Sequence, residues 1–303
     1  MNRWIVRLVV SVVAVGAIVV ATEVPDAEPV GAASASIACE AQPTTEPAGT
    51  PALDSYRAIN PLRLIDTRDG TGGVRSAIGA GCTLEFTPPS TTVPAEAQAV
   101  ALSVTAVAAG RGFFTVSPCA SGRPPTSNVN ARAGIPTPNL VVAMMDSSRR
   151  ICIYSNHLSD VVVDLAGWWG PGTDRFTAVT PVRAYDSRLD AGGVRLTGGA
   201  VRSVPIAPSF VPSGATAAVI NFTATDAVSP GWLVAYPCGE PPPLASNLNV
   251  VAAEDRAVAA IVGLGRSGAD AGRICVRSLM DTHFVIDVTG YYAPAGFGPA
   301  PAL

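Results

Sequence analysis

Two short stretches of the sequence place a carboxylate, a hydroxyl and a guanidinium group side by side. They are Asp66-Thr67-Arg68 and Asp186-Ser187-Arg188. Because a guanidinium group offers planar, bidentate donors, Arg68 and Arg188 are candidates to bind an anionic or polar ligand. The same residues also fit a turn at a strand end, where the aspartate accepts backbone N–H groups and the arginine pairs with a carboxylate such as Asp164 or Asp287. We favour this structural interpretation, because a buried pair that ties two strand ends needs the same side chains.

Two amide side chains stand two residues apart at two further places. The pairs are Asn128 with Asn130 and Asn247 with Asn249. In a strand, residues i and i+2 lie on one face, so each pair presents two amides together. Such amides suit sugar hydroxyls, which makes all four residues candidate ligand-binding groups. The alternative, which we favour, is a polar ladder that hydrogen bonds to the backbone of a neighbouring loop.

Adjacent aromatic residues follow the aspartates Asp164 and Asp287. They are Trp168-Trp169 and Tyr291-Tyr292. Trp168 and Tyr291 are candidate platforms for stacking on a sugar ring. However, neighbouring residues of a strand point to opposite faces, so both members of a pair cannot contact one ligand. Packing in a core or an interface is therefore the favoured role.

Catalytic chemistry has weaker support. Asp164 and Asp287 lie in apolar segments and would suit acid–base catalysis if paired with Asp66 and Asp186, as in a two-carboxylate hydrolase. We instead expect structural polar roles for these four aspartates. The sequence shows no nucleophile elbow, phosphate-binding loop or metal-binding motif, and its two histidines, His157 and His283, do not match in position. We therefore expect no catalytic residues, no metal and no cofactor.

These groups recur because the chain contains two copies of one unit, with matching residues about 120 positions apart. Both copies have short segments bounded by Gly, Pro, Asn and Ser, with the period of two that indicates β-strands. The predicted strands are residues 62–66, 83–86, 99–106, 113–117, 128–131, 140–145, 150–154 and 160–166, then 183–186, 201–206, 217–225, 232–236, 247–251, 257–264, 273–277 and 284–289.

This pattern predicts an all-β protein with two tandem, homologous, jelly-roll-like β-sandwich domains. We place an N-terminal segment at residues 1–35, a Pro/Thr-rich linker at 36–55, the first domain at 56–170, the second at 176–293 and a disordered tail at 294–303. The formal net charge of −3 and the lack of a basic run argue against a nucleic-acid partner.

The N-terminus has the outline of a secretion signal. Arg3 and Arg7 precede an apolar run from Leu8 to Ala21, and small residues follow at 33–35. An uncleaved membrane anchor is the alternative, and it would be the chain's only contact with a membrane. Both interpretations place the remainder of the chain outside the cytoplasm.

The six cysteines suit that compartment, where disulfides persist. Cys119 and Cys152 occupy the same places in the first copy as Cys238 and Cys275 in the second, so pairing within each copy is the economical solution. Each such bridge contributes about 3–4 kcal/mol in the chain-entropy model. The two remaining cysteines, Cys39 and Cys82, are then left to pair with each other. Lipidation of Cys39 is the less favoured alternative, because residues 36–38 make a poor lipobox.

The order D-T-R, V-T-A, P-C, S-N-x-N and V-D-x-x-G followed by two aromatics is similar to the tandem secreted repeat modules of actinobacteria. The resemblance spans residues 56–293 and implies secretion and a β-rich accessory domain, without implying a reaction. All of the basic residues are arginine, and this composition suggests a high-GC genome. Here the two copies and their short flanking arms make up the chain, which favours a stand-alone protein of the cell envelope.

The sequence therefore predicts a secreted or cell-envelope binding or adhesion protein that is not an enzyme. Its predicted partner is a cell-wall glycan or a surface protein, and two similar domains would gain affinity from avidity. Two alternatives stay open: an extracellular carboxylate-dependent hydrolase, and a purely structural envelope or coat component.

Overall fold

The computed structural model describes residues 33–39, 55–190 and 192–296. Most of these residues lie in β-strands, and the helices among them are two short 3₁₀ turns. None of the helices in this described part is long and apolar enough to cross a membrane. The prediction of an all-β fold is confirmed.

The elements of the first copy are β1 (Ser34–Ala38), β2 (Ser55–Asp66), β3 (Thr83–Thr87), β4 (Ala99–Ala108), β5 (Gly112–Pro118), η1 (Cys119–Ser121), β6 (Val129–Ala131), β7 (Thr137–Met144), β8 (Ile151–Ser155) and β9 (Ser159–Gly170). Those of the second copy are β10 (Asp174–Asp186), β11 (Val201–Pro205), β12 (Ala217–Thr225), β13 (Gly231–Pro237), β14 (Leu248–Val250), β15 (Arg256–Gly263), η2 (Gly268–Asp270), β16 (Arg273–Ser278) and β17 (His283–Pro294).

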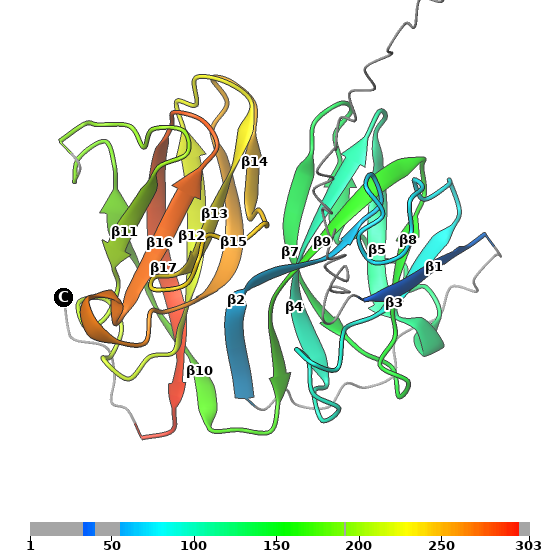
Figure 1. The fold of residues 1–303 in the computed structure, drawn as a ribbon, viewed down its shortest axis with the longest axis horizontal. Helices are drawn as coiled ribbons and strands as arrows, with labels where there is room; N and C mark the ends of the chain where they lie inside the picture. Colours follow the sequence, from blue (N-terminus) through cyan, green and yellow to red (C-terminus); the bar gives the residue numbers. More distant parts are fainter. Residues whose placement is uncertain (1–32, 40–54, 191, 297–303) are drawn as a thin grey trace, which may run out of the picture. The chain divides into compact units, whose positions relative to one another are not determined.

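Each copy is an antiparallel ribbon rolled onto itself. In the first copy β2 pairs with β9, β3 with β8, β4 with β7 and β5 with β6. In the second copy β10 pairs with β17, β11 with β16, β12 with β15 and β13 with β14. This nesting of first strand with last is the jelly-roll arrangement, and it divides each copy into two sheets (Figure 1).

The sheets of the second copy have the orders β10-β17-β12-β15 and β11-β16-β13-β14, and the first copy repeats them as β2-β9-β4-β7 and β3-β8-β5-β6. Alternation along β12 shows how the sandwich closes, because Ile220 and Phe222 point into the core while Asn221 and Thr223 point outward. The inward residues contact those of the opposite sheet, such as Val276, and form one core per copy.

Strand β1 was not predicted, and it corrects the linker boundary. Residues 34–38 pair with β3 and extend its sheet, and Ala33 packs in the core of the first copy. The linker expected at residues 36–55 therefore does not include residues 36–38, whose backbone is paired in the sheet, or Ser55, which begins β2. The remaining linker (40–54), the N-terminal segment (1–32) and the tail from 297 lie outside the described residues, whereas Pro294 still belongs to β17.

Three disulfides link the cysteines as predicted. They are Cys39–Cys82, Cys119–Cys152 and Cys238–Cys275, with sequence separations of 43, 33 and 37 residues. In the chain-entropy model each bridge stabilises the fold by about 4 kcal/mol. The first bridge fastens the N-terminal strand β1 to the first copy.

Candidate functional site

The Asp66-Thr67-Arg68 triplet forms a turn after β2, organised around the buried Asp66 carboxylate. Its oxygens accept hydrogen bonds from the backbone N–H of Arg68, the Arg68 guanidinium and Nη1 of Arg63. This is the favoured strand-end turn, with one correction. Arg68 pairs with the aspartate of its own triplet, whereas the partner of Asp164 is Arg63 at 2.8 Å.

The second triplet repeats this geometry. Asp186 accepts from the backbone and guanidinium of Arg188 and from Nη1 of Arg183. Arg183, and not Arg188, contacts Asp287. The expected pairings of Arg68 with Asp164 and of Arg188 with Asp287 therefore do not form, because each arginine folds back two residues onto its own carboxylate.

The hydroxyl groups of the triplets join each turn to the neighbouring strand of the sheet, which is β9 in the first copy and β17 in the second. Thr67 donates to Asp160 at 2.7 Å and accepts the N–H of Val161. Ser187 accepts the N–H of Phe284 and lies 3.0 Å from Nδ1 of His283. Ser187 is completely buried, so this serine–histidine pair has no path to a substrate and holds the strands together.

The two matching aspartates of the last strands differ in their surroundings. Asp164 has a side chain that is 2% exposed, and it accepts hydrogen bonds from Arg63 and from the backbone N–H of Ser246 in the second copy. The side chain of Asp287 is 22% exposed, and the hydrogen bonds it accepts from described residues all come from Arg183. Contact between the copies thus buries one aspartate and leaves its counterpart open.

Charges around these groups set their protonation. Burial raises the pKa of the Asp164 carboxyl, opposed by the Arg63 guanidinium and the Ser246 N–H, which lower it. Hydrogen bonds from Arg188 lower the pKa of Asp186 to about 2. Both carboxylates are held by arginines, so neither is free for the acid–base role of the hydrolase alternative.

The low pKa of Asp186 predicts an acid-dependent loss of stability. A carboxyl whose folded pKa lies below its unfolded value of about 4 stabilises the fold above that pH, and this contribution disappears as the pH falls through the folded pKa. We expect Asp186→Asn to lower the free energy of unfolding by about 2 kcal/mol near neutral pH, with the gap to the wild type closing towards pH 2. Urea denaturation between pH 7 and pH 2 measures the gap, and the exposed Asp255→Asn is the control. A gap that stays constant with pH would contradict this assignment.

The two asparagine pairs divide into structural and open members. Asn128 and Asn247 accept the backbone N–H of Val116 and Ala235 at 2.7 and 2.8 Å, so their amides hold a neighbouring strand. Asn130 and Asn249 are not tied in this way among the described residues. Asn130 is exposed and Asn249 is half-buried.

The adjacent aromatic residues near the ends of β9 and β17 pack in the interior, which was the favoured role. Tyr291 is 2% exposed and lies in the core of the second copy, and the half-buried Trp168 packs against the core of the first. Trp169 and Tyr292 meet Tyr56 in a cluster shared by both copies. Tyr291 therefore offers no ring to a ligand.

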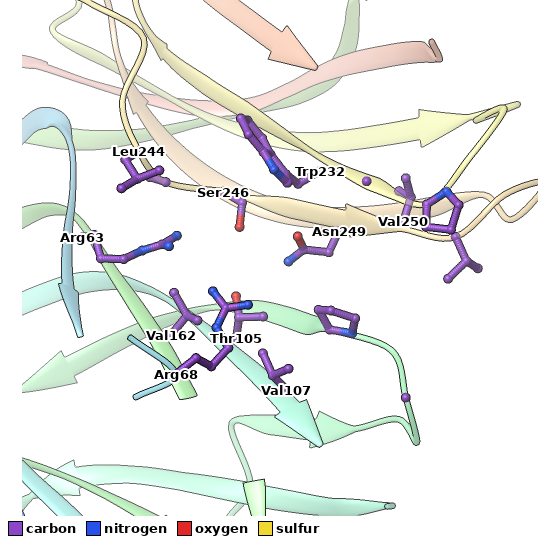
Figure 2. Close-up of a pocket in the computed structure, with 16 residues that line it drawn as sticks. Arg63, Arg68, Thr105, Val107, Val162, Trp232, Leu244, Ser246, Asn249 and Val250 are labelled. Atoms are coloured by element: carbon purple, nitrogen blue, oxygen red, sulfur yellow. The ribbon is translucent and has the colours of Figure 1, made fainter. Parts of the chain in front are cut away.

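A groove of about 460 Å³ lies between the copies and collects candidate residues from both (Figure 2). Arg68 and Thr105 line the wall formed by the first copy, and Trp232, Ser246 and Asn249 line the opposite wall. Two residues predicted separately as ligand-binding groups, Arg68 and Asn249, thus share one site. The sequence could not show this, because the groove exists only where the copies meet.

The groove combines three kinds of interaction. Trp232 is half-buried and presents an indole, with the Arg277 guanidinium 5.9 Å from the centre of the ring. Asn249 contributes an amide, and the side chain of Arg68 is 47% exposed although it is bonded to Asp66. An aromatic ring beside amide and guanidinium donors can hold a ring-shaped, hydroxyl-rich ligand.

Sequence reasoning missed Trp232, Arg63 and Arg183. A signal existed for the arginines, since each stands three residues before the repeated aspartate in both copies. Trp232 matches a phenylalanine in the first copy, so comparison of the copies did not single it out. Among the described residues, the one cluster of possible metal ligands joins Glu85 to Cys119 and Cys152, whose sulfurs form a disulfide.

No protein-family model and no curated protein sequence matches the chain. Among solved structures, the N-terminal CBM22-1-CBM22-2 tandem domain from Paenibacillus barcinonensis Xyn10C is 11% identical, with a TM-score of 0.19. The match covers 78% of this chain and 92% of that chain. A TM-score this low carries no inference about ligand.

Proposed function

We propose that the protein is a secreted or cell-envelope binding protein, not an enzyme, and that it holds a cell-wall glycan in the groove between its two copies. The observation that carries the proposal is the convergence of Trp232, Asn249 and Arg68 on one open groove. The ring would stack on a sugar face, and the amide and guanidinium would hydrogen bond to hydroxyl or carboxylate groups.

The state of the carboxylates supports a binding role. Asp66, Asp164 and Asp186 are buried in ion pairs with arginines, and Asp287 is paired with Arg183. A glycosidase of the usual kind needs two carboxyl groups that face the substrate, one of them as a proton donor. The groove is instead lined by Arg63 and Arg68, which favours a polar or anionic ligand.

The disulfides and the sequence resemblance support the location. Three bridges are typical of proteins that function outside the cytoplasm. The resemblance to secreted actinobacterial repeat modules and the signal-like N-terminus fit the same compartment.

Retention on purified cell-wall peptidoglycan with its attached polysaccharide tests the proposal. The full chain, secreted so that its disulfides form, should bind in moderate salt. We expect Trp232→Ala to weaken binding about tenfold or more, because roughly 1.4 kcal/mol of stacking is lost. Asn249→Ala should weaken it less, and the exposed aromatic control Phe176→Ala should bind like the wild type.

Two outcomes would count against the proposal. Equal binding by wild type and Trp232→Ala would place the ligand elsewhere, and no retention at all would remove the binding function. A further experiment distinguishes a glycan ligand from a surface-protein ligand. If binding to whole envelope is lost after protease treatment but survives glycan digestion, the ligand is a surface protein and not a glycan.

A further inference from the structure

The pairing of an aromatic ring with an amide, seen in the groove, recurs on the outer face of the first copy. Phe113 on β5 stands directly opposite Asn130 on β6, as Trp232 stands opposite Asn249 on β13 and β14. Phe114, the next residue of β5, is fully buried in the core of the first copy. Because successive strand residues point to opposite faces, Phe113 and the amide beside it lie on the outer surface of the sheet.

This second pair lies outside the groove between the copies. Neither Phe113 nor Asn130 lines the groove, and Asn130 is exposed whereas Asn249 is half-buried. The Asn128 amide holds a neighbouring strand, but the Asn130 amide makes no hydrogen bond with the described residues. Both copies therefore present, at the same position, an amide that the described residues leave open to a ligand as donor and acceptor.

A guanidinium group stands beside this pair. Arg123, in the loop after η1, lies over the Tyr154 ring, with its Cζ atom 4.4 Å from the ring centre. The centre of the Tyr154 ring is in turn 6.2 Å from that of Phe113. Stacking on the tyrosine holds the guanidinium plane in one orientation, so its edge donors have a fixed direction. The first copy thus combines a ring, an amide and an oriented guanidinium group on one surface.

We propose that Phe113, Asn130 and Arg123 form a second carbohydrate-binding site, which we call the platform. The Phe113 ring would stack on the face of a sugar, and the amide and guanidinium groups would hydrogen bond to hydroxyl, acetamido or carboxylate groups at its edge. The platform is built by the first copy alone. It therefore goes beyond the groove proposed above and takes no residue from the second copy.

The surroundings of the ring favour a glycan over a protein partner. The exposed neighbours of Phe113 are polar: Arg111 lies two residues before it, and Oδ1 of Asn156 accepts its backbone N–H at 2.6 Å. A protein interface of ordinary size has an apolar centre that is fully removed from water. One half-buried ring among polar residues cannot supply such a centre, but it matches the apolar face and polar edge of a sugar.

A chain with both sites would hold two glycan strands at once, one in the groove and one on the platform. The platform contacts one side of its ligand where the groove encloses two, so we expect it to bind at least about tenfold more weakly. On an insoluble wall the two sites would act together through avidity. The chain would then bridge separate wall fragments, which a single site cannot do.

Retention on purified cell-wall peptidoglycan with its attached polysaccharide, together with light scattering from suspended fragments, tests the proposal. The wild type should be retained and should aggregate the fragments. Phe113→Ala should keep most of the retention but lose the aggregation, because one site remains. Trp232→Ala should keep weak retention, and the double variant Trp232→Ala, Phe113→Ala should keep none. Phe176→Ala, which removes an exposed ring from the second copy, should behave like the wild type.

Asn130→Ala is the variant least able to disturb the fold, since its side chain makes no hydrogen bond with the described residues. In the Trp232→Ala background it should weaken the remaining retention about threefold or more. Urea denaturation checks that each variant folds like the wild type.

The platform is overturned if the double variant binds as well as Trp232→Ala, or if Phe113→Ala still aggregates the fragments. It is also overturned if protease treatment of the wall removes the binding that remains in Trp232→Ala, because the partner is then a protein. Equal retention of wild type and Trp232→Ala, with loss in Phe113→Ala, would remove the groove and leave the platform. The two proposals can therefore fail separately, and absence of any retention of the wild type would overturn both.

Discussion

Arg63→Ala should lower the free energy of unfolding by about 3–5 kcal/mol, whereas the matching change Arg183→Ala should lower it by about 1 kcal/mol or less. Both arginines bridge two aspartates of the same turn and strand. The difference lies in their partners. Without Arg63 the Asp164 carboxylate stays buried beneath the second copy with one backbone hydrogen bond, but without Arg183 the Asp287 carboxylate can be hydrated.

Urea denaturation of the two variants at neutral pH measures the difference. The double variant Arg63→Ala, Asp164→Asn is the internal control, since it removes the uncompensated charge and should recover part of the loss. Equal losses for Arg63→Ala and Arg183→Ala would show that contact between the copies does not seal Asp164 from water. No recovery in the double variant would assign the loss to packing of the arginine stem.

The asymmetry between these arginines marks the limit of sequence reasoning. Much of what one copy determines by itself could be predicted: strands of period two, turns at Gly and Pro, and disulfides placed alike in both copies. The two cysteines without a counterpart were then assigned by elimination, and the structure confirms that pair as well. Strand β1 was missed because its alternation, with Ala35 and Ile37 inward and Ser34 and Ser36 outward, spans only five residues and lies outside the duplicated unit.

What depends on contact between the copies could not be predicted. Asp164 and Asp287 are equivalent in the sequence, and among the described residues the hydrogen bond from the backbone of Ser246 and the burial that accompanies it distinguish them. Every residue except proline has a backbone N–H, so the pattern of side chains in the sequence does not predict that contact. The groove has the same origin, because it draws Arg68 from one copy and Asn249 from the other.

The triplets show a subtler limit. Sequence reasoning correctly treated the aspartate as the centre of a strand-end turn, but it paired that turn's arginine with the distant carboxylate. The structure uses two arginines instead, with Arg68 for Asp66 and Arg63 for both Asp66 and Asp164. Both arginines recur in the second copy, so comparing the copies beyond the triplet itself would have identified the second one.

Tyr56→Ala is the second change for which we expect a large effect, about 3–5 kcal/mol of lost stability. The Tyr56 ring is fully buried, with ring centres of Trp169 and Tyr292 at 4.6 and 4.8 Å. Trp169 comes from the first copy and Tyr292 from the second, so the ring joins the two. Its counterpart Phe176 is 52% exposed, and Phe176→Ala should cost about 1 kcal/mol or less.

The shape of the unfolding curve tests the same point independently. If the shared aromatic cluster couples the copies, the wild type unfolds in one transition, and Tyr56→Ala separates it into two because the copies then unfold separately. Tyr56→Phe is the control that keeps the aromatic ring and removes the hydroxyl. The buried hydroxyl has no hydrogen-bond partner among the described residues, so its removal should be neutral or stabilise by up to about 1 kcal/mol. A single transition in Tyr56→Ala with little loss of stability would mean that the polar contacts of Ser246, and not the aromatic cluster, hold the copies together.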